Sequence, residues 1–501
     1  MKTTLSATGA GSPEEGARPV AMHELSRGRR VGVLMICSLS LLMVGLDVTI
    51  VNVALPDVGR ELHATVSGLQ WVVDAYTLVL ASLLMLSGST ADRLGRRRTF
   101  VVGLSVFSAG SLLCSLAPNL ELLILFRMMQ AVGGSMLNPV AMSIITNTFT
   151  DPRERAQAVG IWGAVVGISM ALGPVIGGLL VSAVGWRSIF WINIPVGIVA
   201  ITLALRYIPE SKAPRARRFD PVGQVCMIVL FAALTYGIIE APDKGWASAP
   251  IVACFGLAAA ALVGLLRYEP RRSDPLIDLR FFRSVPFAAA TVTAVAAFAA
   301  LGGFLFLNTL YLQEVRGLSA LHAGLDTMPM AIMTMAASPI SGRIVGRQGP
   351  RLPLLTSGCA IAVALALLSR MEPTTPFTLL FIAYVIFGLG FGLVNAPITN
   401  AAVSGMPRAQ AGVAAAVAST SRQVGQTLGV ALVGALITSR VHGTIGAGFA
   451  AASHAGWWML AGFGAVVLIL GFLATSRWAL DTARRTAREL NPEVLAPEEA
   501  A

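Results

Sequence analysis

The sequence predicts an all-α integral membrane protein with fourteen transmembrane helices, built as two six-helix bundles with an inserted helix pair. Hydrophobic residues make up 55% of the 501 residues and charged residues only 13%, whereas soluble proteins carry about 25% charged residues. Fourteen apolar runs approach the length of about 20 residues that a membrane helix needs. Part of the sequence also repeats at a constant offset, which carries Ser87 to Ser341.

The apolar runs follow a polar N-terminal segment in which we recognise no cleavable signal peptide. In order, they cover about 31–55, 68–90, 99–117, 119–147, 156–182, 186–208, 221–241, 248–267, 285–312, 320–344, 352–370, 375–400, 410–438 and 456–478. The run at 320–344 is the weakest, because it contains Asp326 and Pro329, and the number becomes twelve if two weak runs do not span.

The expected organisation is a cytoplasmic tail (1–30), a first bundle (31–208), a linker (209–284) that holds the inserted pair, a second bundle (285–479) and a second cytoplasmic tail (480–501). Cytoplasmic loops carry an excess of Lys and Arg. With a cytoplasmic N-terminus, the outside segments hold only Arg60, Arg187, Lys244, Arg316, Arg370 and Arg440. We therefore expect the cell membrane as location, both termini in the cytoplasm, and no nucleic-acid partner.

The repeat indicates two parallel halves. Ser87-Gly88 recurs as Ser341-Gly342, and Asn138-Pro139 is echoed by Asn395-Ala396-Pro397. Asp92 maps onto Gly346, so the second copy has lost its acid. The offset exceeds the length of six helices by about two helices, which places the inserted pair between the halves. Parallel repeats of this kind are typical of transporters.

Four motifs resemble the fourteen-helix drug:proton antiporter branch of the major facilitator superfamily. They are Leu46-Asp47-Val48-Thr49 through Pro56 in the first run, Gly88 through Asp92-Arg93-Leu94-Gly95-Arg96 after the second, Arg127 through Gln130 and Gly134 in the fourth, and Gly173-Pro174 with Gly177-Gly178 in the fifth. The resemblance covers about residues 31–480. It implies proton-coupled transport with functional acids on the first, second and tenth helices.

Charged residues inside membrane helices are costly and therefore functional candidates. The candidates for proton coupling or substrate binding are Asp47, Asp74, Asp326, Arg127 and Arg422. An unpaired carboxylate in an apolar setting can take up a proton, whereas a nearby arginine keeps it ionised. Asp47 and Arg127 are expected at matching depths, so we expect them to interact. Structural hydrogen bonding is the alternative reading for Asp47 and Asp74. The alternatives are a helix-entry position near the outer interface for Asp326 and a fixed structural charge for Arg422.

Three further features complete the predicted machinery. Gln130 and Asn138 share a helical face with Arg127, and Gln426 shares one with Arg422, so both faces are expected to line a water-accessible cavity, with buried helix contact as the alternative. Gly173, Pro174, Gly177 and Gly178 predict a tight, bendable seam, or ordinary small-residue packing. Gly88, Asp92, Arg93, Gly95 and Arg96 predict a cytoplasmic conformational gate, in which Gly95 permits a tight turn.

These observations predict proton-driven efflux of amphipathic, hydrophobic drugs by alternating access. The alternatives are export of one native metabolite or antibiotic, proton-coupled nutrient uptake, and a ligand sensor on a transporter fold. No GxxxxGK[ST] loop occurs, the five histidines lack metal spacing, and no Ser/His/Asp constellation is present. We expect no enzyme activity, ATP use, cofactor or metal. The expected partners are a small amphipathic substrate, protons and the lipid bilayer.

Overall fold

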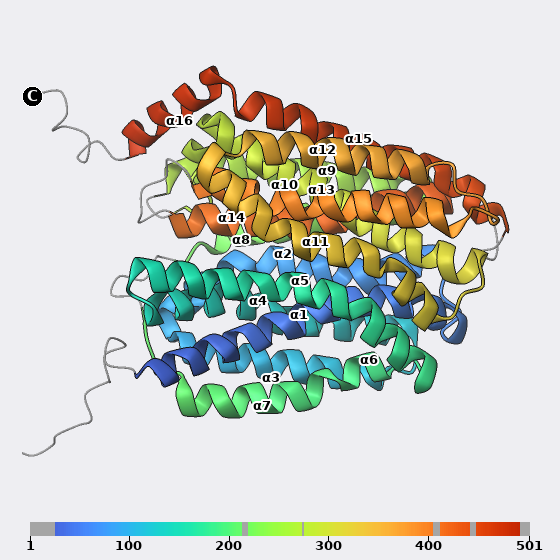
Figure 1. The fold of residues 1–501 in the computed structure, drawn as a ribbon, viewed down its shortest axis with the longest axis horizontal. Helices are drawn as coiled ribbons and strands as arrows, with labels where there is room; N and C mark the ends of the chain where they lie inside the picture. The colour runs from blue at the N-terminus through green and yellow to red at the C-terminus, as the bar shows by residue number, and fades with distance from the viewer. Residues whose placement is uncertain (1–25, 213–218, 273–274, 404–410, 441–446, 491–501) are drawn as a thin grey trace, which may run out of the picture.

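The computed structural model of the chain describes residues 26–212, 219–272, 275–403, 411–440 and 447–490. All regular structure in these ranges is helical. The helices lie side by side along the long axis, and α1 begins at the same end of the molecule where α16 lies (Figure 1). We call this the terminal end and the opposite one the far end. Most of the expected tails, 1–25 and 491–501, lies outside the described residues.

The first group of helices is delimited by local signals in the sequence. Thr65 and Asn119 precede α2 and α4, and their side chains accept hydrogen bonds from the backbone N–H groups of Gly68 and Leu122, which satisfies donors that a helix start leaves free. The helices are α1 (Arg27–Glu61), α2 (Val66–Leu94), α3 (Arg96–Ser115), α4 (Leu120–Thr148), α5 (Pro152–Ala183), the short α6 (Ser188–Trp191) and α7 (Asn193–Tyr207).

The second group repeats the packing of the first. Its members are α10 (Val285–Leu310), α11 (Ala320–Gln348), α12 (Arg351–Leu368), α13 (Phe377–Val403), α14 (Ala411–Thr438) and α15 (Ala447–Ala474). α10 packs against α14 as α1 packs against α5, and α11 packs against α13 as α2 packs against α4. The bounds of α2 and α11 differ by the offset that relates Ser87 to Ser341. The sequence repeat is therefore also a structural repeat.

The inserted pair, α8 (Pro221–Lys244) and α9 (Ala249–Tyr268), packs against only part of the molecule. α8 lies along α2 and α14, where these helices from the two groups meet. Gln224 Nε2 donates to the carbonyl oxygen of Ser82 at 2.5 Å, and Glu240 Oε1 accepts from Trp71 Nε1 at 2.8 Å. Polar contacts near both ends of α8 thus fix it to α2.

After α15 the chain continues as α16 (Arg477–Leu490), so helix covers part of the segment that we expected to be a tail. The hydroxyl oxygen of Thr482 accepts from the backbone N–H of Val285, and Arg283 Nη1 pairs with Glu489 Oε2 at 2.8 Å. α16 is therefore held against the start of α10.

Twelve helices in the described residues are long and apolar enough to cross a membrane. The expected spans at 320–344 and 410–438 do form helices, α11 and α14, but neither is among the twelve. Both helices pack against the other group, α11 on α5 and α14 on α2. Polar residues of α14, which include Arg422 and Gln426, lower the hydropathy of that helix.

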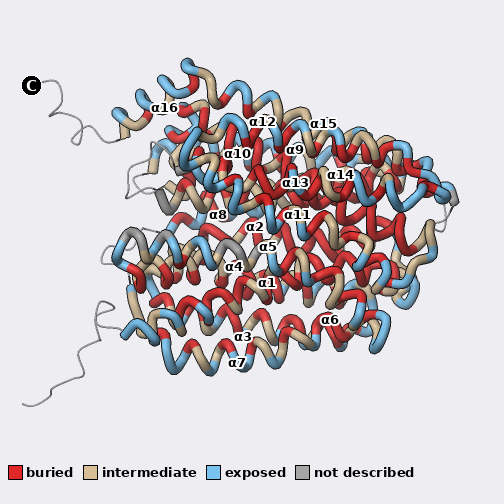
Figure 2. The backbone as a smooth tube through the Cα atoms, in the orientation of Figure 1, coloured by how far each residue is buried: buried red, intermediate tan, exposed pale blue. Residues whose placement is uncertain are grey.

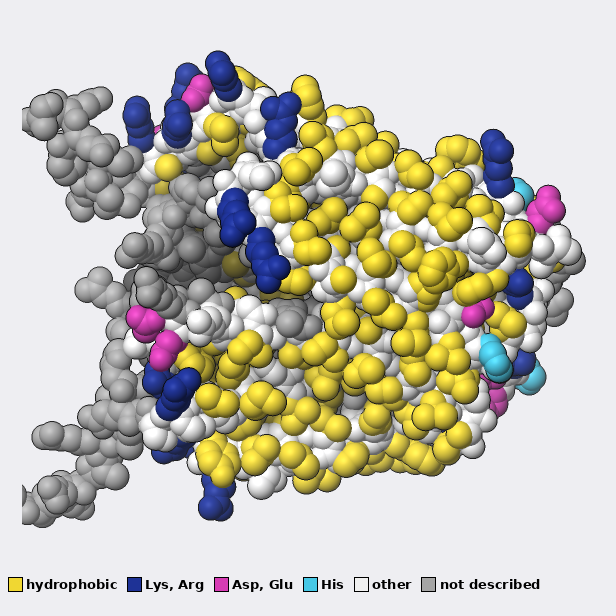
Figure 3. Space-filling view, in the orientation of Figure 1, with side chains coloured by type: hydrophobic (Ala, Val, Ile, Leu, Met, Phe, Trp, Pro, Cys, Tyr) yellow, Lys and Arg dark blue, Asp and Glu magenta, His cyan; other side chains and the backbone are white. Residues whose placement is uncertain are grey.

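Burial follows from this arrangement. Buried residues concentrate where helices face one another, and exposed residues gather on the outside and at the two ends (Figure 2). Large apolar side chains such as Leu179, Ile198 and Leu257 are exposed on the outside, and hydrophobic residues cover much of the surface between the ends (Figure 3). An apolar perimeter of this extent suits contact with lipid.

Candidate functional site

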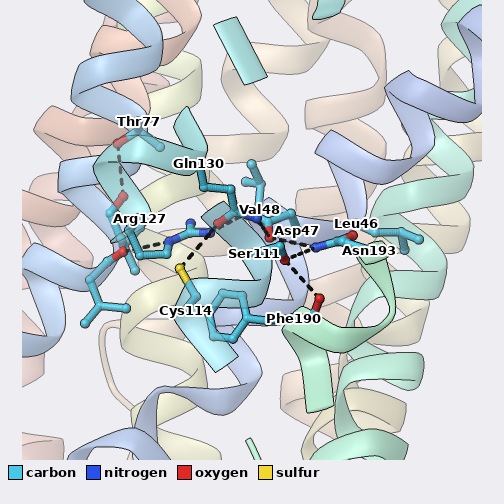
Figure 4. A network of polar contacts seen from close by, with 12 residues as sticks. Leu46, Asp47, Val48, Thr77, Ser111, Cys114, Arg127, Gln130, Phe190 and Asn193 are labelled. Carbon is cyan, nitrogen blue, oxygen red and sulfur yellow. Dashed lines mark hydrogen bonds and ion pairs between the residues drawn. The ribbon is translucent and has the colours of Figure 1, made fainter. Parts of the chain in front are cut away.

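Asp47 on α1 and Arg127 on α4 form a buried ion pair, as their matching depths predict. Arg127 Nη1 donates to Asp47 Oδ2 at 2.6 Å, and the side chains are 2% and 1% exposed, respectively. Gln130 Nε2 and Asn193 Nδ2 donate to Asp47 Oδ1 at 2.8 and 3.3 Å (Figure 4). The Arg127 guanidinium also lies 4.1 Å from the centre of the Tyr76 ring. Asp47 is thus fully engaged in hydrogen bonds.

In this conformation, Gln130 on α4 lies in a buried helix contact, which is the alternative to the expected cavity face. Gln130 is fully buried, and its Oε1 accepts from Arg127 Nη1 at 2.7 Å. Asn138 is half-buried. Gln426 on α14 is also buried and packs against Gly302 of α10. Of the polar residues on this face of α4, Gln130 binds the buried pair, whereas the Oδ1 atom of Asn138 has no hydrogen-bond partner among the described residues.

Asp74 on α2 has the opposite character. Its side chain is fully buried, and neither carboxylate oxygen has a hydrogen-bond partner in the described part of the chain. Gln70 and Thr77 lie on the same helical face, and both contact α14: Gln70 Nε2 donates to the carbonyl oxygen of Ala431 at 3.0 Å, and the Thr77 and Thr427 hydroxyls lie 2.7 Å apart. Asp74 is therefore at the seam between the two groups.

The glycines of the fifth-helix motif pack against two different partners. Gly173 and Gly177 lie against Thr49 and Ile50 of α1. Gly178 approaches the backbone of α11, where a Cβ atom would come within 2.6 Å of the carbonyl oxygen of Ala320. The motif thus packs α5 against α1 of its own group and against α11 of the other group.

The predicted gate residues form the turn between α2 and α3 at the terminal end. Gly95 has a φ of +116° and both ends α2 and begins α3, a conformation that favours glycine. Asp92 Oδ1 accepts from Arg96 Nη2 at 2.9 Å. Gly88 faces Pro139 of α4, and Arg93 is exposed. Arg97 and Arg98 of this turn each lie 3.8 Å from Glu210.

The remaining two candidates lie in the second group and do not join the Asp47 network. Asp326 on α11 is partly exposed near the far end, with Arg316 and His322 as its charged or titratable neighbours. Arg422 on α14 is half-buried, and its Nη2 donates to Thr399 Oγ1 on α13 at 2.6 Å. Apart from the paired Asp47 and Arg127, the candidates thus lie in separate environments.

The two groups touch at the far end and separate at the terminal end. Besides Gln70, Gln313 Nε2 in the π-helical turn Tyr311–Val315 donates to the carbonyl oxygen of Val53 at 2.9 Å, and Arg60 Nε lies 4.0 Å from Glu314 Oε1. At the terminal end the surface is hollowed between the groups, and Lys and Arg side chains gather around it (Figure 3). The far end is therefore closed in this conformation.

Comparison with known proteins assigns this architecture. Residues 37–430 match the Major Facilitator Superfamily. The chain belongs to this superfamily. Among its members, it is 37% identical to Multidrug resistance protein Stp of Mycobacterium tuberculosis over 412 residues, which cover 82% of this chain and 76% of the relative. It is also 37% identical to the Tetracenomycin C resistance and export protein of Streptomyces glaucescens over 417 residues, 83% and 77% of the two chains.

Solved structures of transporters share the superfamily fold. A bacterial homologue of the human lysosomal transporter Spinster, in an inward-facing and occupied conformation, matches with a TM-score of 0.65 and 18% identity over 90% of this chain and 98% of that one. A nucleoside transporter matches with a TM-score of 0.63 and 14% identity over 89% and 100%. The fold, the superfamily and the resistance proteins among the relatives support a membrane transporter for small molecules.

Two helix-stabilising contacts of this superfamily member were missed from the sequence. Glu210, after α7, accepts from the backbone N–H groups of Arg97 and Arg98 at 3.1 and 3.2 Å and so caps α3 beside the gate turn. Glu240 bonds to Trp71 and pairs with Lys244 at 3.1 Å. Both acids lie near the ends of apolar runs, where a solvated side chain is the usual expectation. The composition of these runs therefore did not indicate either contact.

Proposed function

We propose that the chain exports amphipathic, hydrophobic compounds across the cytoplasmic membrane in exchange for protons, by alternating access, as a member of the fourteen-helix drug:proton antiporter branch. The relatives that are named for multidrug resistance or for resistance to one antibiotic support export of toxic compounds. The excess of Lys and Arg at the terminal end supports a cytoplasmic location of that end.

All fourteen long helices cross the bilayer in this proposal. α11 and α14 contain 29 and 28 residues, which correspond to roughly 40 Å at 1.5 Å per residue, more than the roughly 30 Å of a hydrocarbon core. They pack beside helices that are long and apolar enough to span. The proposed units are the expected bundles, 31–208 and 285–479, joined by the linker 209–284.

The observation that carries the proton coupling is the unpartnered carboxyl group of Asp74. An ionised carboxylate without partners is very costly to bury, so the seam between α2 and α14 can close over Asp74 only when the group is neutral. Proton uptake from outside then favours the conformation with a closed far end. Loss of the proton to the cytoplasm favours reopening of the far end, and this linkage couples proton entry to export.

Asp47 takes a supporting role in this proposal. Its carboxylate accepts hydrogen bonds from Arg127, Gln130 and Asn193. It therefore holds α1, α4 and α7 together while Asp74 exchanges the proton. The gate turn at Asp92 closes the terminal end when the far end opens.

The test compares Asp74→Asn with wild type in proteoliposomes, using a substrate found by screening toxic compounds for resistance on overexpression. The amide cannot exchange a proton, so we expect pH-driven uptake into the vesicles to disappear while substrate exchange without a pH gradient continues. Asp74→Glu should retain part of the pH-driven transport. Wild-type pH-driven rates in Asp74→Asn would refute the assignment.

A second candidate is a dedicated exporter of one antibiotic. The names of the tetracenomycin C and methylenomycin A resistance proteins favour it, since each names a single compound. The resistance screen separates the two functions, because a dedicated exporter raises tolerance to one chemical scaffold and a multidrug exporter raises tolerance to several.

A further inference from the structure

Arg422 is a cation within a helix that we propose to cross the membrane. It lies 11 residues into α14, so it is roughly 16 Å from the start of the helix at 1.5 Å per residue. Its Nη2 donates to the hydroxyl of Thr399 on α13, and the guanidinium carbon lies 6.0 Å from the centre of the Phe298 ring on α10. Its Nε has no hydrogen-bond partner among the described residues. Three helices of the second group thus surround a partly unsatisfied charge.

The second group offers no counter-ion for this charge. Within residues 26–212, 219–272, 275–403, 411–440 and 447–490, no carboxylate lies within 4 Å of Arg422. Between residues 285 and 474 the sequence has only three acids, Glu314, Asp326 and Glu372. Glu314 and Asp326 flank the start of α11 and Glu372 precedes α13, so all three belong to the far end.

The first group does not supply a counter-ion either. Near the terminal end, Asp92 pairs with Arg96, and Glu154 pairs with Arg30. Asp47 is bound to Arg127 and is completely enclosed, and Asp74 forms no ion pair with any described residue. A charge inside a membrane protein is costly unless it is paired, and no described acid pairs with Arg422, so Arg422 is open to an anionic partner that is not part of the described residues.

We propose that Arg422 binds the anionic group of the exported compound, so that the preferred substrates are aromatic amphiphiles carrying a carboxylate, a sulfonate or an acidic hydroxyl. This inference rests on the proposed export function and names its substrate class. The guanidinium fork can bind such a group through two parallel hydrogen bonds. Phe298, which packs edge to face on Phe391 with ring centres 5.1 Å apart, provides an apolar surface for the aromatic body.

The test is the binding of two probes with one ring system, 1-pyrenebutyrate and its neutral amide, to the full chain in phosphatidylcholine nanodiscs. We expect wild type to bind the acid at least about tenfold more tightly, which is typical for a hydrogen-bonded charge. Arg422→Gln should bind both probes equally, and Arg422→Lys should retain part of the preference. Arg343→Gln, which removes an exposed arginine of α11, should retain all of it.

Several results would overturn the inference. The inference fails if wild type binds the acid no better than the amide, or if Arg422→Gln keeps the wild-type preference. A preference that disappears when phosphatidylglycerol is added to the nanodiscs would assign Arg422 to a lipid phosphate. If Arg422→Gln does not fold, an undiminished preference in Arg422→Lys overturns the proposal, because the ammonium lacks the planar fork.

The proposed export function and the proposed substrate class can be refuted independently of each other. If no compound in the resistance screen is exported by wild type, the proposed function fails. If neutral compounds are exported in preference to acidic ones, and equally fast by wild type and Arg422→Gln, the export function stands and the anionic substrate class is refuted.

Discussion

Replacement of Asp47 by Asn tests whether the buried ion pair stabilises the fold or carries the transported proton. In the variant, Arg127, which is 2% exposed, would lose its counter-charge. The new amide N–H group or oxygen would also have to fit the donors of Gln130 and Asn193, which now lie 2.8 and 3.3 Å from Asp47 Oδ1. Removing one partner of a buried ion pair costs about 3–5 kcal/mol, so we expect the free energy of unfolding to fall by that amount.

A double-mutant cycle measures this interaction. Arg127→Gln alone should destabilise the protein by a similar amount, whereas Asp47→Asn with Arg127→Gln should recover much of the loss, because no buried charge remains unpaired. Thermal unfolding in detergent then ranks the stability of wild type, the two single variants and the double variant. The matched control is Asp57→Asn on the same helix, whose pair with the largely exposed Arg60 should contribute less than about 1 kcal/mol.

The result that would refute this reasoning is an Asp47→Asn protein as heat-stable as wild type. If that protein also lost pH-driven transport, Asp47 would regain the coupling role that the sequence predicted, and Asp74 would lose it.

Three further substitutions address the seam, the gate turn and its cap. Gly324→Val should shift the protein away from the conformation closed at the far end, because any Cβ there overlaps the carbonyl oxygen of Pro174; increased labelling of single cysteines from outside would show it. Asp92→Asn should slow turnover several-fold but change substrate affinity little, and a large loss of affinity with normal turnover would contradict the gate. Glu210→Gln should lower stability by about 1 kcal/mol through the weakened cap of α3, measured by thermal unfolding, and unchanged stability would contradict the capping role.

The helices could be predicted because lipid-facing helices must be apolar over a nearly fixed length. The expected run 68–90 became α2, Val66–Leu94, and it extends beyond the run because polar residues at membrane boundaries continue the helix. The run 186–208 divides into α6 and α7 around Ile192. The signal for this break is Pro195, which lacks the N–H group that would bond to the carbonyl oxygen of Trp191 in a continuous helix. The hydropathy of α11 and α14 could not show their position at the seams, since that depends on the other group.

Depth predicted the contact between Asp47 and Arg127 but not its surroundings. The helical rise gives the height of a residue in the membrane, whereas the direction of its side chain depends on how the helix packs. For this reason a polar face on α4 could be assigned either to a cavity or to buried contacts. Asp74, like Asp47, was a candidate because it is an acid within a membrane helix. Only the packing of α2 against α14 shows that Asp74 lacks the hydrogen-bond partners that Asp47 has.

The inserted helices remove the symmetry of the molecule in the plane of the membrane. Ile238 and Ile239 of α8 pack with Ala431 and Ala435 of α14, so α8 covers the α2–α14 seam on its outer side. Within the described residues, the α5–α11 seam has no third helix packed along it in this way. In the proposed transporter, α8 would therefore block the entry of a compound from the bilayer at the α2–α14 seam. The α5–α11 seam has no such cover, so the two sides of the molecule differ in their access from the lipid.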